Sequence, residues 1–233
     1  MNILAIETAS EACSAALLQS DNSNNAQDIA VRFQHAPREH TKLILPMLDE
    51  VLEETNCSLK EVDAIAFGRG PGAFTGLRIA SGIAQGIALA GDIPVIPVST
   101  LESLAQTTLN NLEEGQTVIA ALDARMNEVY WGEFVRQQGL LVLIGKEQVT
   151  SPQQLVDSKS TQQASLVIGN GWEVYFSDIP KNITLIRGAF PSAEQVAELA
   201  LPQLNKGNFV SPEQAQPRYI RNNVAKKSSV DLI

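Results

Sequence analysis

Apolar residues follow two different spacings along this chain, and each spacing predicts one kind of element. Short runs in which nearly every residue is apolar predict buried strands, whereas apolar residues at every third or fourth position predict amphipathic helices. In the first half of the chain, the predicted strands cover residues 2–8, 13–19, 29–34, 62–67 and 93–98. The predicted helices cover residues 43–54, 75–90 and 100–110. The expected order is therefore β-β-β-α-β-α-β-α.

The second half of the chain begins again with the same pattern. A buried strand ending at Asp123 is followed by another strand, just as a strand ending at Glu7 is followed by one in the first half. The further strands expected in this half cover residues 129–134, 140–149 and 165–168. Two α/β lobes of one topology are the simplest account. We expect a first lobe at residues 1–110, a second at residues 111–217 and a basic C-terminal tail at residues 218–233, for which a return to the first lobe is one option.

Helix starts are marked by serines that are followed, three positions later, by Glu or Gln. This pattern is typical of a capping box, in which the serine side chain accepts a hydrogen bond from an otherwise unpaired backbone N–H group. The pairs are Ser99 with Glu102, Ser151 with Gln154, and Ser192 with Gln195. Each pair predicts a helix that begins directly after its serine.

A glycine-rich segment joins the strand at residues 62–67 to a stretch of small and aliphatic residues at 79–90, and its glycines are Gly68, Gly70, Gly72 and Gly76. Such a turn can aim backbone N–H groups at a phosphate. A Walker loop is excluded, because no lysine lies between Lys60 and Lys146. A dinucleotide fingerprint fits formally, but the next strand ends in Ser99 and not in an acidic residue. The other interpretation is that these glycines permit a tight turn and close helix packing.

The charge balance argues against nucleic-acid binding by this chain alone, because 26 acidic residues outnumber 17 basic ones. The tail at residues 218–233 is locally basic, which suits contact with RNA or an acidic partner, or a solvated end. No apolar stretch approaches the roughly 20 residues that a membrane span needs. Two cysteines in 233 residues favour a reducing compartment, so we expect a cytoplasmic protein.

Several motifs along the chain resemble the TsaB (YeaZ) family. In chain order they are Ile3-Leu4-Ala5-Ile6-Glu7-Thr8, His40 with Leu45-Pro46-Met47, the segment 68–78, Val98-Ser99-Thr100-Leu101, Ala121-Leu122-Asp123-Ala124-Arg125 and Tyr219-Ile220-Arg221. The resemblance covers nearly the whole chain. It implies a two-lobed actin/hexokinase/Hsp70-like (ASKHA) fold built from two ribonuclease H-like units.

The resemblance also implies a function. A member of this family would be a non-catalytic scaffold and activating subunit of the complex that transfers threonylcarbamoyl from threonylcarbamoyl-adenylate to the adenosine beside the anticodon of tRNAs. Its partners would be a TsaD-like catalytic paralogue and a TsaE-like ATPase, with tRNA met mainly through the complex, and a homodimer when alone. The alternative is an independent nucleotide-dependent kinase or hydrolase of the same superfamily.

The candidate chemistry of the chain favours the non-catalytic interpretation. The only histidines, His35 and His40, are five apart, which does not suit a metal pair on one helix face, so we expect no metal. Superfamily members that use ATP carry Asp-x-Gly in the first hairpin, where this chain has Glu7-Thr8-Ala9. We therefore expect no bound cofactor and no catalytic residue, with Glu7, Thr8 and Gly72 as weak candidates for nucleotide contact. Peptidase chemistry is disfavoured, because the chain has no Gly-x-Ser-x-Gly motif and Cys13 lies on an apolar strand.

The helix after the glycine-rich segment is apolar around most of its circumference. Its polar residues Arg78, Ser81 and Gln85 share one stripe. Gly82 and Gly86 would let a second helix approach closely, either the helix at 43–54 of the same lobe or a helix of another subunit. The candidate partner residues are Leu43, Met47, Val51, Ile79, Gly82, Ile83 and Gly86. Arg69 and Arg78 either tie down the glycine-rich segment, through its carbonyl groups and Glu7, or remain available to an anion.

Overall fold

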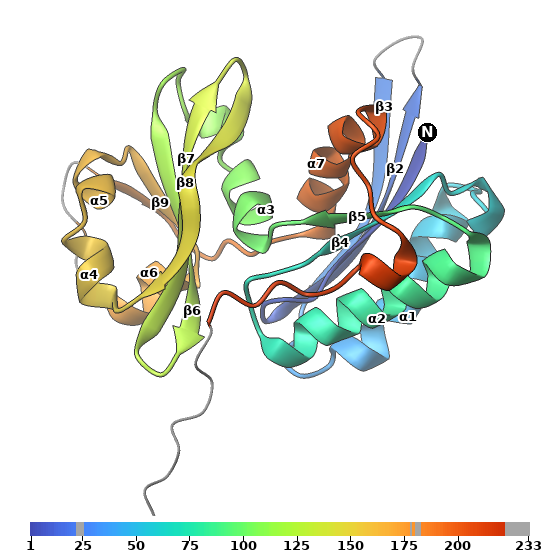
Figure 1. Cartoon of the computed structure of the whole chain (residues 1–233), viewed down its shortest axis with the longest axis horizontal. Helices are drawn as coiled ribbons and strands as arrows, with labels where there is room; N and C mark the ends of the chain where they lie inside the picture. The colour runs from blue at the N-terminus through green and yellow to red at the C-terminus, as the bar shows by residue number, and fades with distance from the viewer. Residues whose placement is uncertain (22–25, 178, 180–182, 222–233) are drawn as a thin grey trace, which may run out of the picture.

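The computed structural model describes residues 1–21, 26–177, 179 and 183–221, which form two lobes side by side (Figure 1). The first lobe is built on a five-stranded sheet of order β3-β2-β1-β4-β5. Its strands are β1 (Asn2–Glu7), β2 (Ala12–Asp21), β3 (Ala26–His35), β4 (Ala64–Gly68) and β5 (Val95–Val98). The helices of this half are α1 (His40–Glu54), α2 (Phe74–Gly91) and α3 (Thr100–Gln106). The predicted order of elements is confirmed.

The second lobe has a five-stranded sheet of order β10-β9-β6-β7-β8. Its strands are β6 (Thr117–Arg125), β7 (Glu128–Gln137), β8 (Leu140–Thr150), β9 (Leu166–Ile168) and β10 (Thr184–Ile186). The helices of the second half of the chain are α4 (Pro152–Val156), α5 (Lys159–Gln163), α6 (Asn170–Tyr175) and α7 (Ala193–Asn205). Short 3₁₀ turns lie at η1 (Leu59–Glu61), η2 (Leu109–Asn111) and η3 (Pro212–Gln214). The sequence pattern missed α5, α6 and β10, because elements this short contain too few positions to establish a period.

Each half of the chain gives its last helix to the sheet of the other lobe. Leu101 and Leu104 of α3 pack in the core of the second sheet with Val118 and Phe134. Conversely, α7 covers one face of the first sheet, where its residues Ala193, Val196, Ala197 and Ala200 pack against β1, β2 and β4. The chain therefore passes between the lobes from β5 to α3 and again from β10 to α7.

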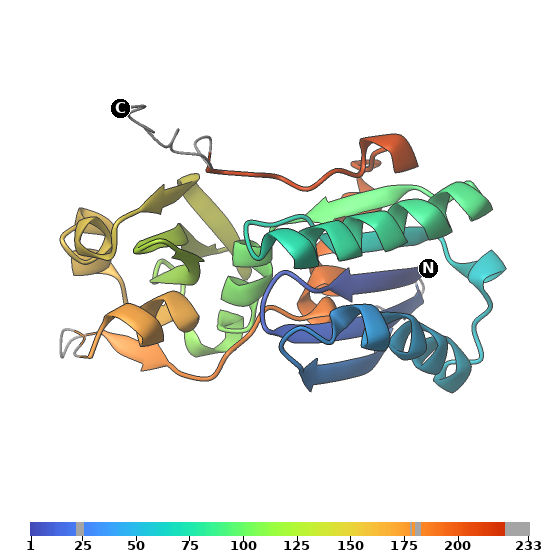
Figure 2. The ribbon, with the colours of Figure 1, turned by 90° about the horizontal axis from the view of Figure 1, so that it is seen from below.

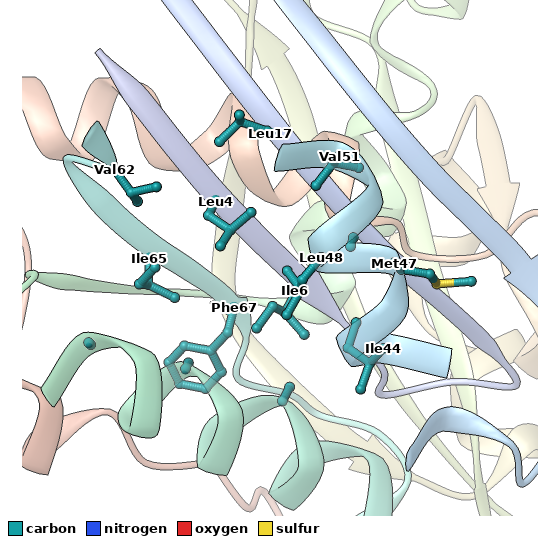
Figure 3. Close-up of a cluster of buried hydrophobic side chains, with 14 of the residues drawn as sticks. Leu4, Ile6, Leu17, Ile44, Met47, Leu48, Val51, Val62, Ile65 and Phe67 are labelled. Carbon is teal, nitrogen blue, oxygen red and sulfur yellow. The ribbon is translucent and has the colours of Figure 1, made fainter. Parts of the chain in front are cut away.

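The other face of the first sheet is covered by α1 and α2, and Figure 3 shows the core that they enclose. Strand residues such as Leu4, Ile65 and Phe67 meet α1 there and the alanines of α2. Met47 and Val51 belong to this core and are only 7% and 0% exposed. The prediction that these two residues anchor a partner is therefore wrong, because their side chains already stabilise their own lobe.

Residues 222–233, which make up most of the predicted basic tail, lie outside the described residues. The residues just before them follow a defined path. After η3, residues 215–221 run along α2 and then to the second lobe, as Figure 2 shows. None of the helices in the described part of the chain combines the length and apolar character needed to cross a membrane.

Candidate functional site

The glycine-rich segment lies directly on the turn of the first hairpin, between β1 and β2. The Ala73 N–H donates to the Ala9 carbonyl over 2.7 Å, and the Thr8 hydroxyl donates to the Gly76 carbonyl over 2.7 Å. A Cβ atom on Gly72 or Gly76 would overlap the backbone of this turn. These two glycines therefore serve close packing, and α2 begins at Phe74, one residue before the predicted start.

Glu7 is enclosed beneath this segment and has no exposed surface. Its Oε1 accepts a hydrogen bond of 2.6 Å from the Ala9 N–H, and its Oε2 accepts one of 3.3 Å from the Thr100 hydroxyl. Burial raises the pKa of Glu7 to about 7, although the bond from Ala9 acts in the opposite direction. A Cβ atom on Gly68 would overlap this carboxyl group, so the end of β4 requires glycine there.

Thr8 is buried as completely as Glu7. Neither residue lines the space between the lobes, so we correct their assignment as ligand contacts. Gly72, the remaining candidate, does line that space. The turn at which the resemblance implied phosphate contact is thus covered by this chain's own backbone.

The cleft between the lobes has a volume of about 640 Å³. It is lined by Ala9, Ser10, Glu11, Gly72, Ala73, Phe74, Leu122, Asp123, Ala124, Arg125, Tyr130, Asn170, Tyr219 and Arg221. The lining is largely aromatic and aliphatic, with a few charged groups at the hairpin turns. Glu11 and Arg125, from the two hairpins, approach to 3.8 Å across it. The sequence did not predict that Tyr219 and Arg221 line this cleft. The only signal for these two residues in the sequence was the family motif that contains them.

Asp123, the counterpart of Glu7 in the second lobe, lines the cleft but is held by groups of its own lobe. Its Oδ1 accepts from the Arg125 N–H and from the Tyr175 hydroxyl, each over 2.8 Å. Its Oδ2 lies 3.1 Å from the Arg125 guanidinium. Asn170, in the Gly169-Asn170-Gly171 turn, accepts from the Asp123 N–H over 3.0 Å. This turn therefore fixes the second hairpin and opens α6.

The two histidines lie in different surroundings. His40 is buried, and its Nε2 lies 3.0 Å and 3.2 Å from the carbonyl oxygens of Ser10 and Ala12, so this nitrogen serves as a donor to the first hairpin. His35 lies 3.6 Å from Glu11 and packs on the ring of Phe190. Within the ranges that the structure describes, no three His, Cys, Asp or Glu side chains gather closely enough to hold a metal ion. Burial raises the pKa of the Cys13 thiol to about 11, as suits a core residue.

The outer face of α2 is the second candidate site. Gly82 and Gly86 are exposed, and a Cβ atom on either would meet nothing within 4 Å. The alternative in which α1 fills this space is therefore excluded. Ile79 and Ile83 are partly buried beside the glycines, as is Leu43 on α1, and Leu89 is 66% exposed.

The polar stripe of α2 faces the C-terminal segment instead. Ser81 is buried and donates to the Ala215 carbonyl over 2.7 Å. Arg78 lies 3.8 Å over the ring of Phe74 and donates to the Tyr219 hydroxyl over 3.4 Å. The Arg69 carbonyl accepts from the Arg218 N–H over 2.8 Å. The backbone of Arg69 and the side chain of Arg78 therefore hold the C-terminal segment.

Comparison with known proteins identifies the family. The curated tRNA threonylcarbamoyladenosine biosynthesis protein TsaB of Haemophilus influenzae is 40% identical over 97% of this chain and 96% of its own length. The protein of the same name from Escherichia coli is 42% identical over 97% of each chain. This chain belongs to the TsaB family. A family model described as TsaD, tRNA N6-adenosine threonylcarbamoyltransferase, also matches residues 21–228.

Solved structures of TsaB-like proteins agree with this membership. The structure described as YeaZ from Pseudomonas aeruginosa is 39% identical, with a TM-score of 0.80 over 94% of this chain and 99% of that one. Another from the same organism, described as an uncharacterized protein with similarity to peptidase YEAZ, has a TM-score of 0.83 at 40% identity over the same shares of the two chains. The predicted family and the two-lobed fold are thus confirmed.

Proposed function

We propose that this chain takes part in tRNA threonylcarbamoyladenosine biosynthesis as a non-catalytic scaffold and activating subunit in the cytoplasm. The names of its TsaB relatives support the pathway. The scaffold role rests on the outer face of α2, which leaves small and apolar residues exposed on a helix that is otherwise packed. The partner is a TsaD-like catalytic paralogue, joined by a TsaE-like ATPase, and tRNA is met mainly through this complex.

The geometry of α2 suits a helix as its partner. Gly82 and Gly86 are one turn apart on the same exposed face, so a second helix can approach to the short end of the usual 8–10 Å interaxial range. Ile79 and Ile83 flank the glycines on one side, and Leu89 extends the apolar face toward the end of α2. Because every copy of the chain has this face, two copies are expected to form a homodimer in the absence of the paralogue.

The surroundings of the hairpin carboxylates favour a separate catalytic subunit. Glu7 has no access to solvent, and Asp123 is held by Arg125 and Tyr175. Neither carboxylate is free to act on a bound substrate in this arrangement. The cleft of about 640 Å³ is the observation that favours the second candidate, an independent nucleotide-dependent kinase or hydrolase.

Reconstitution separates the two candidates. The chain, a TsaD-like paralogue and a TsaE-like ATPase are mixed with tRNA and threonylcarbamoyl-adenylate, and the modified nucleoside is measured after digestion of the tRNA. Product should form only when the paralogue and this chain are both present. Nucleotide turnover or tRNA modification by this chain alone would contradict the scaffold role and favour the second candidate.

A bulky side chain on α2 tests the partner surface itself. Gly82→Trp or Gly86→Trp should abolish both the complex with the paralogue and the homodimer on a sizing column, while the far-ultraviolet circular dichroism is unchanged. Gln153→Trp, on the exposed side of α4 in the other lobe, is the matched control and should leave both assemblies intact. If the Gly82→Trp chain still forms the complex and the homodimer normally, the proposed partner surface is wrong.

A smaller substitution at Gly86 should change the stability of the monomer and its association in opposite directions. Gly86→Ala should stabilise the isolated monomer by about 0.5–1 kcal/mol, because alanine is the better helix former and its Cβ meets no neighbour. The same methyl group should weaken association, because it holds the partner helix further away. Urea unfolding of dilute protein and sedimentation at higher concentration measure the two effects separately.

A further inference from the structure

Residues 217–221, which we call the strap, run across the molecule from α2 to the second lobe. In Figure 1 the strap leaves η3 beside α2 and ends close to β6, and Figure 2 shows the same path from below. The two views together place the strap across both lobes, along the cleft that Tyr219 and Arg221 line. The chain elsewhere passes between the lobes from β5 to α3 and from β10 to α7.

The strap is fixed to the first lobe at successive residues. The Arg218 N–H donates to the Arg69 carbonyl over 2.8 Å, and the strap passes so close to Gly70 that a Cβ there would lie 3.0 Å from the Arg218 carbonyl oxygen. The ring of Tyr219 packs on that of Phe74 with centroids 5.5 Å apart. These contacts hold the strap on the glycine-rich segment and on the first turn of α2.

The strap is fixed to the second lobe by two arginine side chains. The Arg218 guanidinium lies 3.5 Å from the carboxylate of Glu147, a buried residue of β8. The Arg221 guanidinium forms an ion pair with Glu128 and donates to the Ala124 carbonyl over 3.0 Å. Arg218 thus contacts the first lobe through its backbone and the second lobe through its side chain.

Arg221 binds one particular conformation of the second hairpin. The residues of the β6–β7 turn, Arg125, Met126 and Asn127, have φ values of 61°, 56° and 59°, which non-glycine residues adopt rarely. The Arg221 guanidinium donates hydrogen bonds to the two carbonyl groups at the start of this turn and lies near the ring of Tyr130. Only 15% of its side chain is exposed. The contact therefore depends on the backbone of this hairpin as well as on its charge.

We propose that the strap is a latch that sets the angle between the two lobes, with Arg221 as its attachment to the second hairpin. Apart from the strap, the lobes meet through the two chain crossings, the packing of α3 on α7 and the Glu11–Arg125 pair, and lobes joined in this way can rotate about the line through their crossings. A tie across the cleft, remote from both crossings along the chain, removes this rotation. Release of the strap therefore opens the cleft, and the lobes close again when Arg221 recovers the β6–β7 turn.

Distance measurements between the lobes test this proposal. Spin labels on Thr41→Cys in α1 and Gln153→Cys in α4 occupy exposed helix positions in different lobes, while the native Cys13 and Cys57 are buried. A chain ending at Gln216 lacks the strap, whereas a chain ending at Arg221 retains it. We expect the shorter chain and the Arg221→Ala variant to give broader distributions at longer distance than the full chain. The chain ending at Arg221 and the control Arg187→Ala should match the full chain.

Hydrogen exchange gives a second readout that keeps the latch distinguishable from a local effect. In Arg221→Ala, exchange should rise both in the β6–β7 turn and in the glycine-rich segment of the other lobe. An unchanged distance distribution for the chain ending at Gln216 would overturn the proposal. If Arg221→Ala alters exchange only in the β6–β7 turn, with no change in distance, Arg221 merely stabilises that turn and the latch is likewise refuted.

Discussion

The two hairpins that meet at the cleft have the same topology but place their carboxylates in opposite environments. Glu7, at the end of β1, lies under the glycine-rich segment with no exposed surface. Asp123, near the end of β6, lines the cleft and is held by hydroxyl and guanidinium groups. The same position in a repeated fold is therefore a buried structural contact in one lobe and part of the cleft surface in the other.

The difference arises from the turn that precedes the second crossover helix of each lobe. In both lobes the start of that helix places a glycine against the backbone of the first strand or of the residue after it, Gly171 against Ala121 of β6 and Gly76 against Thr8, which follows β1. In the first lobe the turn is longer, and its extra residues cover the hairpin. The second lobe has only Gly169 between β9 and α6, so its hairpin remains open to the cleft.

The largest effect should come from filling the glycine contact in the first lobe. Gly76→Ala puts a Cβ atom into the Thr8 carbonyl, and neither backbone can move without displacing α2 or β1. We expect the free energy of unfolding to fall by about 3 kcal/mol, the upper end of the usual range for overpacking. Gly171→Ala, whose Cβ would lie 2.9 Å from the Ala121 carbonyl carbon, should show a smaller loss. Urea unfolding provides the measurement, and equal stability of Gly76→Ala and the unmodified chain would contradict the packing argument.

The next effect concerns the pH dependence of stability. Because the folded pKa of Glu7 is about 7 and its ordinary value is 4.5, the folded state holds this proton more tightly than the unfolded state does. The resulting stabilisation is complete below pH 4.5 and is lost as the pH rises through 7. It amounts to roughly 3 kcal/mol at most, at 1.36 kcal/mol for each unit of pKa.

Glu7→Gln should remove that dependence, because glutamine can still accept from the Ala9 N–H but does not titrate. Unfolding in urea at a series of pH values between 5 and 8 would give a shallower slope for this variant than for the unmodified chain. Asp123→Asn is the matched change in the other hairpin and should leave the Glu7 contribution in place. An identical slope for Glu7→Gln and the unmodified chain would refute the assignment.

The smallest effect should come from the second hairpin. Tyr175→Phe removes the 2.8 Å hydrogen bond to Asp123 and should lower the free energy of unfolding by about 1 kcal/mol. Tyr130→Phe, which also removes a hydroxyl group at the cleft, is the control and should have less effect. Thermal unfolding of the two variants side by side makes the comparison. A loss in Tyr130→Phe as large as that in Tyr175→Phe would remove the special role of the Asp123 contact.

Local sequence patterns predicted the elements well wherever the elements were long. The helix starts at Ser99 and Ser151 are confirmed, since each serine accepts from the N–H three residues later. At Ser192 the side chain instead accepts from the Glu194 N–H, two residues on. The helix that the pattern predicted at residues 75–90 is α2, which begins one residue earlier, at Phe74.

The sequence by itself determined the repeated order of elements and the glycine-rich turn, because periodicity and capping depend on residues only a few positions apart. It also indicated the family, through the motifs along the chain. The tertiary structure alone decided which side chains are available at the surface. Glu7 is buried because Gly68 leaves room for it, and Met47 and Val51 enter the core because α1 lies on the first sheet. Ser81 is covered by Ala215, and Arg221 reaches Ala124 across the cleft. Such contacts join residues far apart along the chain, so no local pattern can specify them.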